Sequence, residues 1–173
     1  MEWPAILEGS KETVTSLVGF LTSGAAVLMG SAFIYSGFSK MVAHSKGQRH
    51  GQPTAGPVAI NLLIGAIMVQ LSFMVDQFIV SMFGAGREDP NAAMSYMPSP
   101  VKDNVLLQQA VNAAVLWIYA IGFIAIFRGL VQWNALASGR GSAQDNGWKG
   151  FWHIFFGALA VNLTGFLRVL TSN

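Results

Sequence analysis

The sequence predicts an all-α integral membrane protein with four transmembrane helices, arranged as two tandem helical hairpins with both termini outside. Composition is the first reason: hydrophobic residues make up 53% of the 173 residues and charged residues only 10%, whereas a soluble domain carries about 25% charged residues. The second reason is that four apolar stretches, each able to cross a hydrocarbon core of about 30 Å, alternate with polar loops. A chain with so few charges cannot cover itself with a water-facing surface of ordinary polarity.

Charge and cysteine content exclude several classes of function. The formal net charge is only +2, and Lys and Arg form no continuous run, so we expect no direct sequence-specific binding of nucleic acid. Cysteine is absent, which excludes disulfide bonds, thiolate nucleophiles and thiolate metal sites. The N-terminal segment is acidic, opposite in sign to the start of a secretory signal. We therefore expect the first apolar stretch to be retained.

The first half of the chain divides into an interfacial segment and a hairpin. Residues 1–13 mix apolar and charged side chains, as expected of one or two helical turns lying on the bilayer surface. The first transmembrane hairpin covers 14–83, with helices predicted at about 14–38 and 58–83. The loop between these helices is basic and rich in Gly and Pro, which are typical of turns.

The second half of the chain repeats this plan after a long loop. Residues 84–103 form a predicted extracytoplasmic loop with three prolines. It is long for a bundle connection, so we expect it to be mobile or docked on a partner. The second transmembrane hairpin covers 104–173, with helices predicted at about 105–130 and 151–170.

The distribution of lysine and arginine predicts the orientation in the membrane. The first loop carries Lys40, Lys46 and Arg49 without an acid, and the third carries Arg140 and Lys149 with one acid. Four helices put these two loops on the same side, which the positive-inside rule assigns to the cytoplasm. The sequence thus predicts a multi-pass protein of the bacterial inner membrane with basic cytoplasmic loops and both termini outside.

The two hairpins resemble each other when the chain is shifted by 92 positions. Gly30 then coincides with Gly122 and Gly65 with Gly157, and the loops between the helices match in length. A duplicated two-helix unit keeps its orientation, so this repeat is parallel and not of the inverted kind common in transporters. We therefore interpret the chain as two copies of one membrane hairpin.

Small residues mark the expected packing surfaces of the helices. Glycine lets a neighbouring backbone approach closely in lipid, because no side chain holds the two helices apart. The alternative is that glycine is simply frequent in membrane helices. The candidate packing positions are Gly19, Gly30, Gly65, Gly157 and Gly165.

Two charged residues lie at equivalent depths of the second and fourth helices. Asp76 coincides with Arg168 under the shift of 92, and an ionised side chain at that depth costs on the order of a few kcal/mol unless it meets a partner or water. If the hairpins pack about a pseudo-twofold axis, the two residues can form an intramembrane ion pair that fixes hairpin register. The alternatives are a proton or ion relay, or an arginine that snorkels to the interface.

Polar side chains in the second and fourth helices form a second candidate set. Amides that find no water in lipid bind one another, so these residues are expected to hold helices together, and the alternative is that they line a pathway. The set comprises Asn61, Gln70, Gln77, His153 and Asn162. His153 has no second His or carboxylate at a ligand spacing, so we expect no metal and no cofactor. No Ser has a neighbouring His and Asp, and no glycine-rich phosphate loop follows a strand, so we expect no catalytic residue and no enzyme.

The closing segment, HIFFGALAVNLTGF at 153–166, resembles the small inner-membrane components of type IVB secretion and conjugation systems. This family includes TraQ of IncI plasmids and its IcmC and DotE relatives. The hairpin, with both ends outside and a short basic cytoplasmic loop, also resembles the pilins of conjugation systems before their extraction from the membrane.

The resemblance implies a non-enzymatic inner-membrane subunit, pilin-like in its hairpins, of a type IV apparatus for DNA or protein transfer. Its expected partners are membrane lipid, further copies of itself and other subunits of the secretion system, and its hairpins could be assembled into an extracellular pilus. The alternative is a small ion or solute channel or transporter subunit, with the polar residues of the helices lining a pathway.

Overall fold

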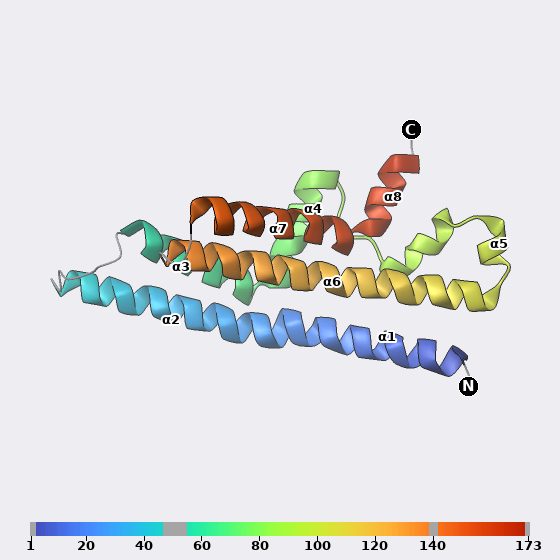
Figure 1. Ribbon diagram of the computed structural model, residues 1–173, viewed down its shortest axis with the longest axis horizontal. Coiled ribbons are helices and arrows are strands. Elements are labelled where there is room, and N and C mark those ends of the chain that lie inside the picture. The colour runs from blue at the N-terminus through green and yellow to red at the C-terminus, as the bar shows by residue number, and fades with distance from the viewer. Residues whose placement is uncertain (1–2, 47–54, 139–141, 172–173) are drawn as a thin grey trace.

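The protein is all-helical, as its sequence predicts. The computed structural model describes residues 3–46, 55–138 and 142–171, and no strand occurs in these three ranges (Figure 1). Two helices, Ala5–Ser45 and Val105–Ala137, are long and apolar enough to cross a membrane, and the number rises to four if each of two bent helix pairs counts as one span.

The first unit consists of a long straight helix and a bent one. Helix α1 (Trp3–Gly19), the π-helical turn η1 (Phe20–Ala25) and helix α2 (Ala26–Ser45) form one continuous rod. The predicted helix at 14–38 is therefore too short, because the segment before it continues the same helix. Helices α3 (Ala55–Val69) and α4 (Leu71–Phe83) follow and meet at an angle of 94°.

The second unit, like the first, consists of one long helix and one bent helix. Helix α6 (Val105–Ala137) begins where the Asn104 side chain accepts hydrogen bonds from two backbone amides. The π-helical turn η3 (Ala143–Gly147) leads into α7 (Trp148–Val161), and α8 (Leu163–Thr171) follows at 74° to the preceding helix.

Both bends occur at the same position of the repeat. Gln70 separates α3 from α4 with φ −115° and ψ 39°, and Asn162 separates α7 from α8 with φ −113° and ψ 39°. These two residues are related by the shift of 92. The predicted uninterrupted helices at 58–83 and 151–170 are therefore wrong. Neither break carries a Pro or Gly, the usual cause of a kink.

Glycines hold each unit together through the same contacts. A Cβ on Gly30 would lie 2.7 Å from the carbonyl oxygen of Gly65, and a Cβ on Gly122 would lie 2.7 Å from that of Gly157. Only glycine allows the two backbones to come so close. The matching bends and matching glycine contacts make the two units copies in structure as well as in sequence.

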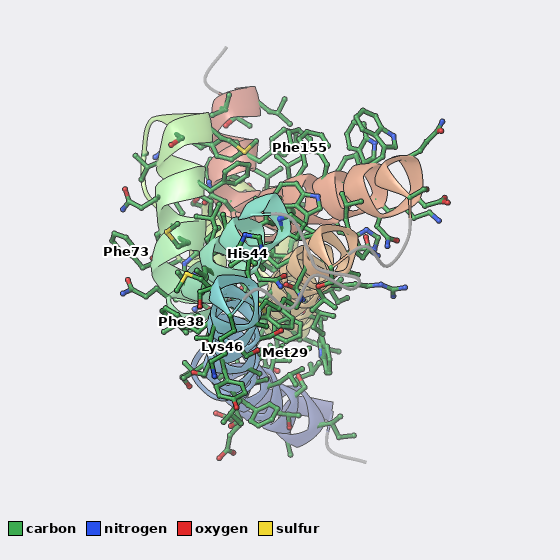
Figure 2. The ribbon with its side chains drawn as sticks, turned by 90° about the vertical axis from the view of Figure 1, so that its left-hand side faces the viewer. Met29, Phe38, His44, Lys46, Phe73 and Phe155 are labelled. Carbon is green, nitrogen blue, oxygen red and sulfur yellow. The ribbon has the colours of Figure 1, made fainter. Side chains whose placement is uncertain are left out.

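The segment between the units is folded back onto the protein. It contains the 3₁₀ helix η2 (Pro90–Tyr96) and the short helix α5 (Ser99–Lys102). Figure 1 places this segment and the start of α1 at one end of the bundle, opposite the ends of α2 and α6. Figure 2 looks onto that opposite end and shows His44 and Lys46 of the end of α2 there. Which side of a membrane each end faces stays a prediction.

The two units pack through different faces. The core joins the bent helix of the first unit to the long helix of the second, and α1 also packs along α6. Helices α2 and α7 lie at the outer sides of the stack (Figures 1 and 2). The arrangement is not the pseudo-twofold one that an ion pair between Asp76 and Arg168 would require, which would bury the same face of both units. The main core residues are Ile64, Met68, Leu71, Val75 and Ile79 from the first unit and Phe123, Ile126, Leu130, Ala158 and Val161 from the second.

Candidate functional site

The polar residues that the structure brings together lie where α4, α8 and the loop between the units meet. We call this cluster the clasp. It connects α4 and α8, the second halves of the two bent helices, to the segment that follows α4. Its members are Asp76, Arg87, Glu88, Asn162 and Arg168.

Arg87 forms the first half of the clasp. The chain turns sharply at Gly84, whose φ of 69° is in the left-handed region that favours glycine. Arg87 then returns to α4, with its Nε 3.3 Å from Oδ1 of Asp76. Its guanidinium carbon lies 5.7 Å from the ring centre of Tyr119 and 5.5 Å from that of Phe123. The cation is thus held by one carboxylate and by two aromatic rings of α6.

Glu88 forms the second half of the clasp. Its carboxylate pairs with the guanidinium of Arg168 on α8, and its backbone N–H donates to Oδ1 of Asn162 over 3.1 Å. A Cβ on Gly165 would lie 2.8 Å from that same Asn162 oxygen. Gly165 therefore leaves the space that the buried amide of Asn162 occupies.

The predicted ion pair between Asp76 and Arg168 is not formed. Asp76 pairs with Arg87, and Arg168 pairs with Glu88. Equal depth in the two units does not make these residues neighbours, because the units meet through different faces. The loop inserts one cation and one anion between them, so each charge finds a partner on the loop.

The five predicted polar helix residues do not follow one common path. Asn61 is buried and accepts a hydrogen bond from the Ser138 hydroxyl on α6 over 3.4 Å, which joins the two units. Asn162 is buried in the clasp. Of the remaining three, Gln70 and Gln77 are exposed, and Nδ1 of His153 lies 2.7 Å from the Lys149 carbonyl oxygen of the preceding helical turn.

The predicted packing glycines behave differently from one another. Gly30, Gly65 and Gly157 make close backbone contacts, and Gly165 makes room for Asn162. Gly19 has no neighbour that a Cβ would meet within 4 Å, so it closes no helix contact inside this chain.

The structure describes three of the five residues predicted to form the basic cytoplasmic loops. Lys40 is half-buried, Lys46 is exposed at the end of α2, and the exposed Lys149 lies 3.3 Å from Asp145 one turn earlier. Arg49 and Arg140 lie outside the described residues.

The three larger hollows on the surface are mainly apolar, whereas a small one of about 70 Å³ between α1 and α6 is lined by Glu8, Lys11 and Gln109 with Leu7. One groove of about 400 Å³ runs along α6 and α7 between Gly122 and Phe156. Another, of about 530 Å³, lies between α3 and α6, and a third of about 200 Å³ lies beside α4. Within the described ranges, no three His, Asp or Glu side chains are grouped so that they could hold a metal ion. The three larger hollows suit hydrocarbon chains or other helices.

Sequence reasoning missed Arg87 and Glu88, although it named their partners. The available signal was the acidic and basic run at 87–89 in an otherwise apolar chain. Since both carboxylates of the clasp are engaged by guanidinium groups, the arrangement can fix α4, α8 and the loop in one geometry. No known protein family matches the chain, and neither a curated protein nor a solved structure matches it significantly.

Proposed function

We propose that this chain is a non-enzymatic inner-membrane subunit of a type IV conjugation or secretion apparatus for DNA or protein transfer. In this proposal each bent helix pair counts as one span, which gives four spans with both termini outside. The subunit contributes packing surfaces to an assembly, and its hairpins have a pilin-like topology.

The observation that supports an assembly role best is the duplicated hairpin. The two helices of each unit meet through a close glycine contact, and the clasp and core join the two units to each other. The chain is thereby built as two equal blocks with apolar outer faces. The resemblance of segment 153–166 to type IVB components directs this assembly role toward a transfer apparatus.

Deleting the gene from a donor cell tests the proposal. We expect conjugative transfer or effector delivery to be lost while growth is unaffected, and the intact gene to restore transfer. A Phe73→Ala variant is the matched control, because Phe73 projects outward from α4 (Figure 2), and we expect it to restore transfer fully. Unchanged transfer in the deletion strain would overturn the proposal.

One observation favours the channel or transporter alternative. Helices interrupted at corresponding positions of two repeats mark the substrate site of many transporters, and Gln70 and Asn162 are such a pair. The apolar grooves give this alternative less support than the breaks do. Ion or solute flux in liposomes that is lost in Gln70→Ala, and kept in a control Gln77→Ala, would favour it over the assembly role.

A further inference from the structure

The two units of the chain meet through a different face of each unit. Because the units are repeats, each of these two faces has an equivalent on the other unit, and both equivalents are uncovered. From the first unit the interface buries the α3 face, where Ile64 is 2% exposed, together with the side of α1 that packs on α6. From the second unit it buries the α6 face, where Leu130 is 3% exposed and Ala120 is fully buried. Ile64 and Leu130 belong to the core that joins the two units.

The equivalent of the buried α3 face lies on α7 and is exposed. Phe156 takes the position of Ile64 under the shift of 92, and it is 57% exposed. The groove of about 400 Å³ lies here. Two of its lining residues, Ile121 and Ala125, take the positions of Met29 and Phe33, which pack against the core in the first unit. We call this surface the α7 face.

The equivalent of the buried α6 face lies on α2 and is exposed as well. Phe38 takes the position of Leu130 and is 50% exposed, and Leu28 takes the position of Ala120 and is 73% exposed. Tyr35 and Val42 continue the same stripe at helical spacing. We call this surface the α2 face.

We infer that copies of this chain assemble head-to-tail, with the α2 face of one copy seated on the α7 face of the next. The contact continues the interface already present between the two units of one chain. It deepens the proposed function and rests on the assembly role stated there, because it names a second copy as the partner.

The side chains on the two uncovered faces differ in size from their equivalents at the internal interface. The incoming α2 face carries Leu28 where α6 has Ala120. The receiving α7 face carries Ala125 where the first unit has Phe33, and a groove lies at that place. Other positions carry larger residues than their equivalents, with Phe38 in place of Leu130 and Phe156 in place of Ile64, so the contact repeats the faces of the internal interface but not its detailed packing. An interface that joins two different faces does not end at a dimer: repetition gives a ring, or a filament if the ring does not close.

Introduced cysteines test this contact, because the natural chain has none. The Ser138 hydroxyl and the Asn61 amide oxygen lie 3.4 Å apart across the internal interface, and their equivalents on the two uncovered faces are Lys46 and His153. We expect Lys46→Cys and His153→Cys chains, co-expressed and oxidised in membranes, to form a mixed disulfide dimer. The double variant should form a ladder of dimers, trimers and longer species.

Two controls make the result specific. An Asn61→Cys, Ser138→Cys double variant should cross-link within one chain and confirms that the chemistry works at this spacing. A Lys46→Cys chain mixed with Phe73→Cys, which is exposed on α4, should give no mixed dimer. The inference is overturned if Lys46→Cys and His153→Cys link no better than this pair, as expected if lipid alone covers both faces. Preferential linking of Lys46→Cys to itself would also overturn it, because that pattern indicates a twofold dimer.

The outcome is separable from that of the transfer assay. A ladder from a chain whose deletion leaves transfer unchanged would refute the transfer function and keep the head-to-tail contact. Loss of transfer without a ladder would refute the contact alone.

Discussion

A pair of facing glycines sets the distance between the two helices of each unit, Gly30 with Gly65 in the first and Gly122 with Gly157 in the second. A Cβ on Gly122 would lie 2.7 Å from the Gly157 carbonyl oxygen and 2.9 Å from the backbone nitrogen of Val161. Because both neighbours are backbone atoms, no rotamer change can relieve the clash, and α6 must separate from α7. The small residue is therefore required by geometry at this position.

We predict that Gly122→Ala destabilises the protein by about 1–3 kcal/mol, the usual range for an overpacked contact. Unfolding of the detergent-purified chain by SDS measures this change. Gly19→Ala is the matched control: it has open space around it, and alanine favours a helix over glycine by about 1 kcal/mol. Equal loss of stability in both variants would show that close packing is not the cause.

The charges of the clasp should be coupled in pairs. Arg168→Glu places two carboxylates together and should destabilise the protein, and the double charge reversal Glu88→Arg, Arg168→Glu should recover part of the loss. Since the Arg168 side chain is 42% exposed and that of Glu88 19%, we expect a coupling energy of about 1 kcal/mol. A double variant as unstable as the sum of the single variants would contradict the pairing.

At the level of single residues, the sequence predicts contacts between helices of the same unit better than contacts between the two units. Gly30, Gly65 and Gly157 coincide across the repeat, and their role depends only on the adjacent helix of the same unit. Asp76 and Arg168 also occupy equivalent positions of the repeat. Whether they form an ion pair, however, depends on which faces of the two units meet, and in the structure each pairs with a loop residue instead. The repeat pattern alone carries no information on that choice.

The bent helices are the elements in which sequence and structure differ most. Apolar runs of 20 residues indicate uninterrupted helices, and neither Gln70 nor Asn162 is a helix breaker of the usual kind. The bend at Asn162 is stabilised from outside, by the hydrogen bond from Glu88 and the space beside Gly165. Such tertiary support cannot be read from periodicity.

We predict that Asn162→Ala releases the loop that holds Arg87 and Glu88. The hydrogen bond of 3.1 Å from the Glu88 N–H to Asn162 is lost, and only the ion pair with Arg168 then connects Glu88 to α8, although Arg87 keeps its contacts with Asp76 and the aromatic rings. Trypsin should cut after Arg87 faster than in the natural protein. Gln70→Ala changes the equivalent but exposed residue and should leave the cleavage rate unchanged. Identical rates in all three proteins would contradict the role given to Asn162.

At the scale of the whole molecule, the all-helical architecture and the duplicated plan could be predicted, because both follow from composition and from the shift of 92. The arrangement of the two units could not. It depends on complementary shapes of the α3 and α6 faces, and the units are too alike for the sequence to say which face of one meets which face of the other. Their stacking through different faces is what leaves the α2 and α7 faces free for further copies.

The mass of the purified protein is the most direct test of this architecture. Light scattering in mild detergent, corrected for bound detergent, should give a protein mass that is a multiple of the 18.5 kDa chain and larger than a dimer, because head-to-tail contacts do not stop at two copies. A uniform mass of a single chain across the accessible concentration range would contradict the assembly role.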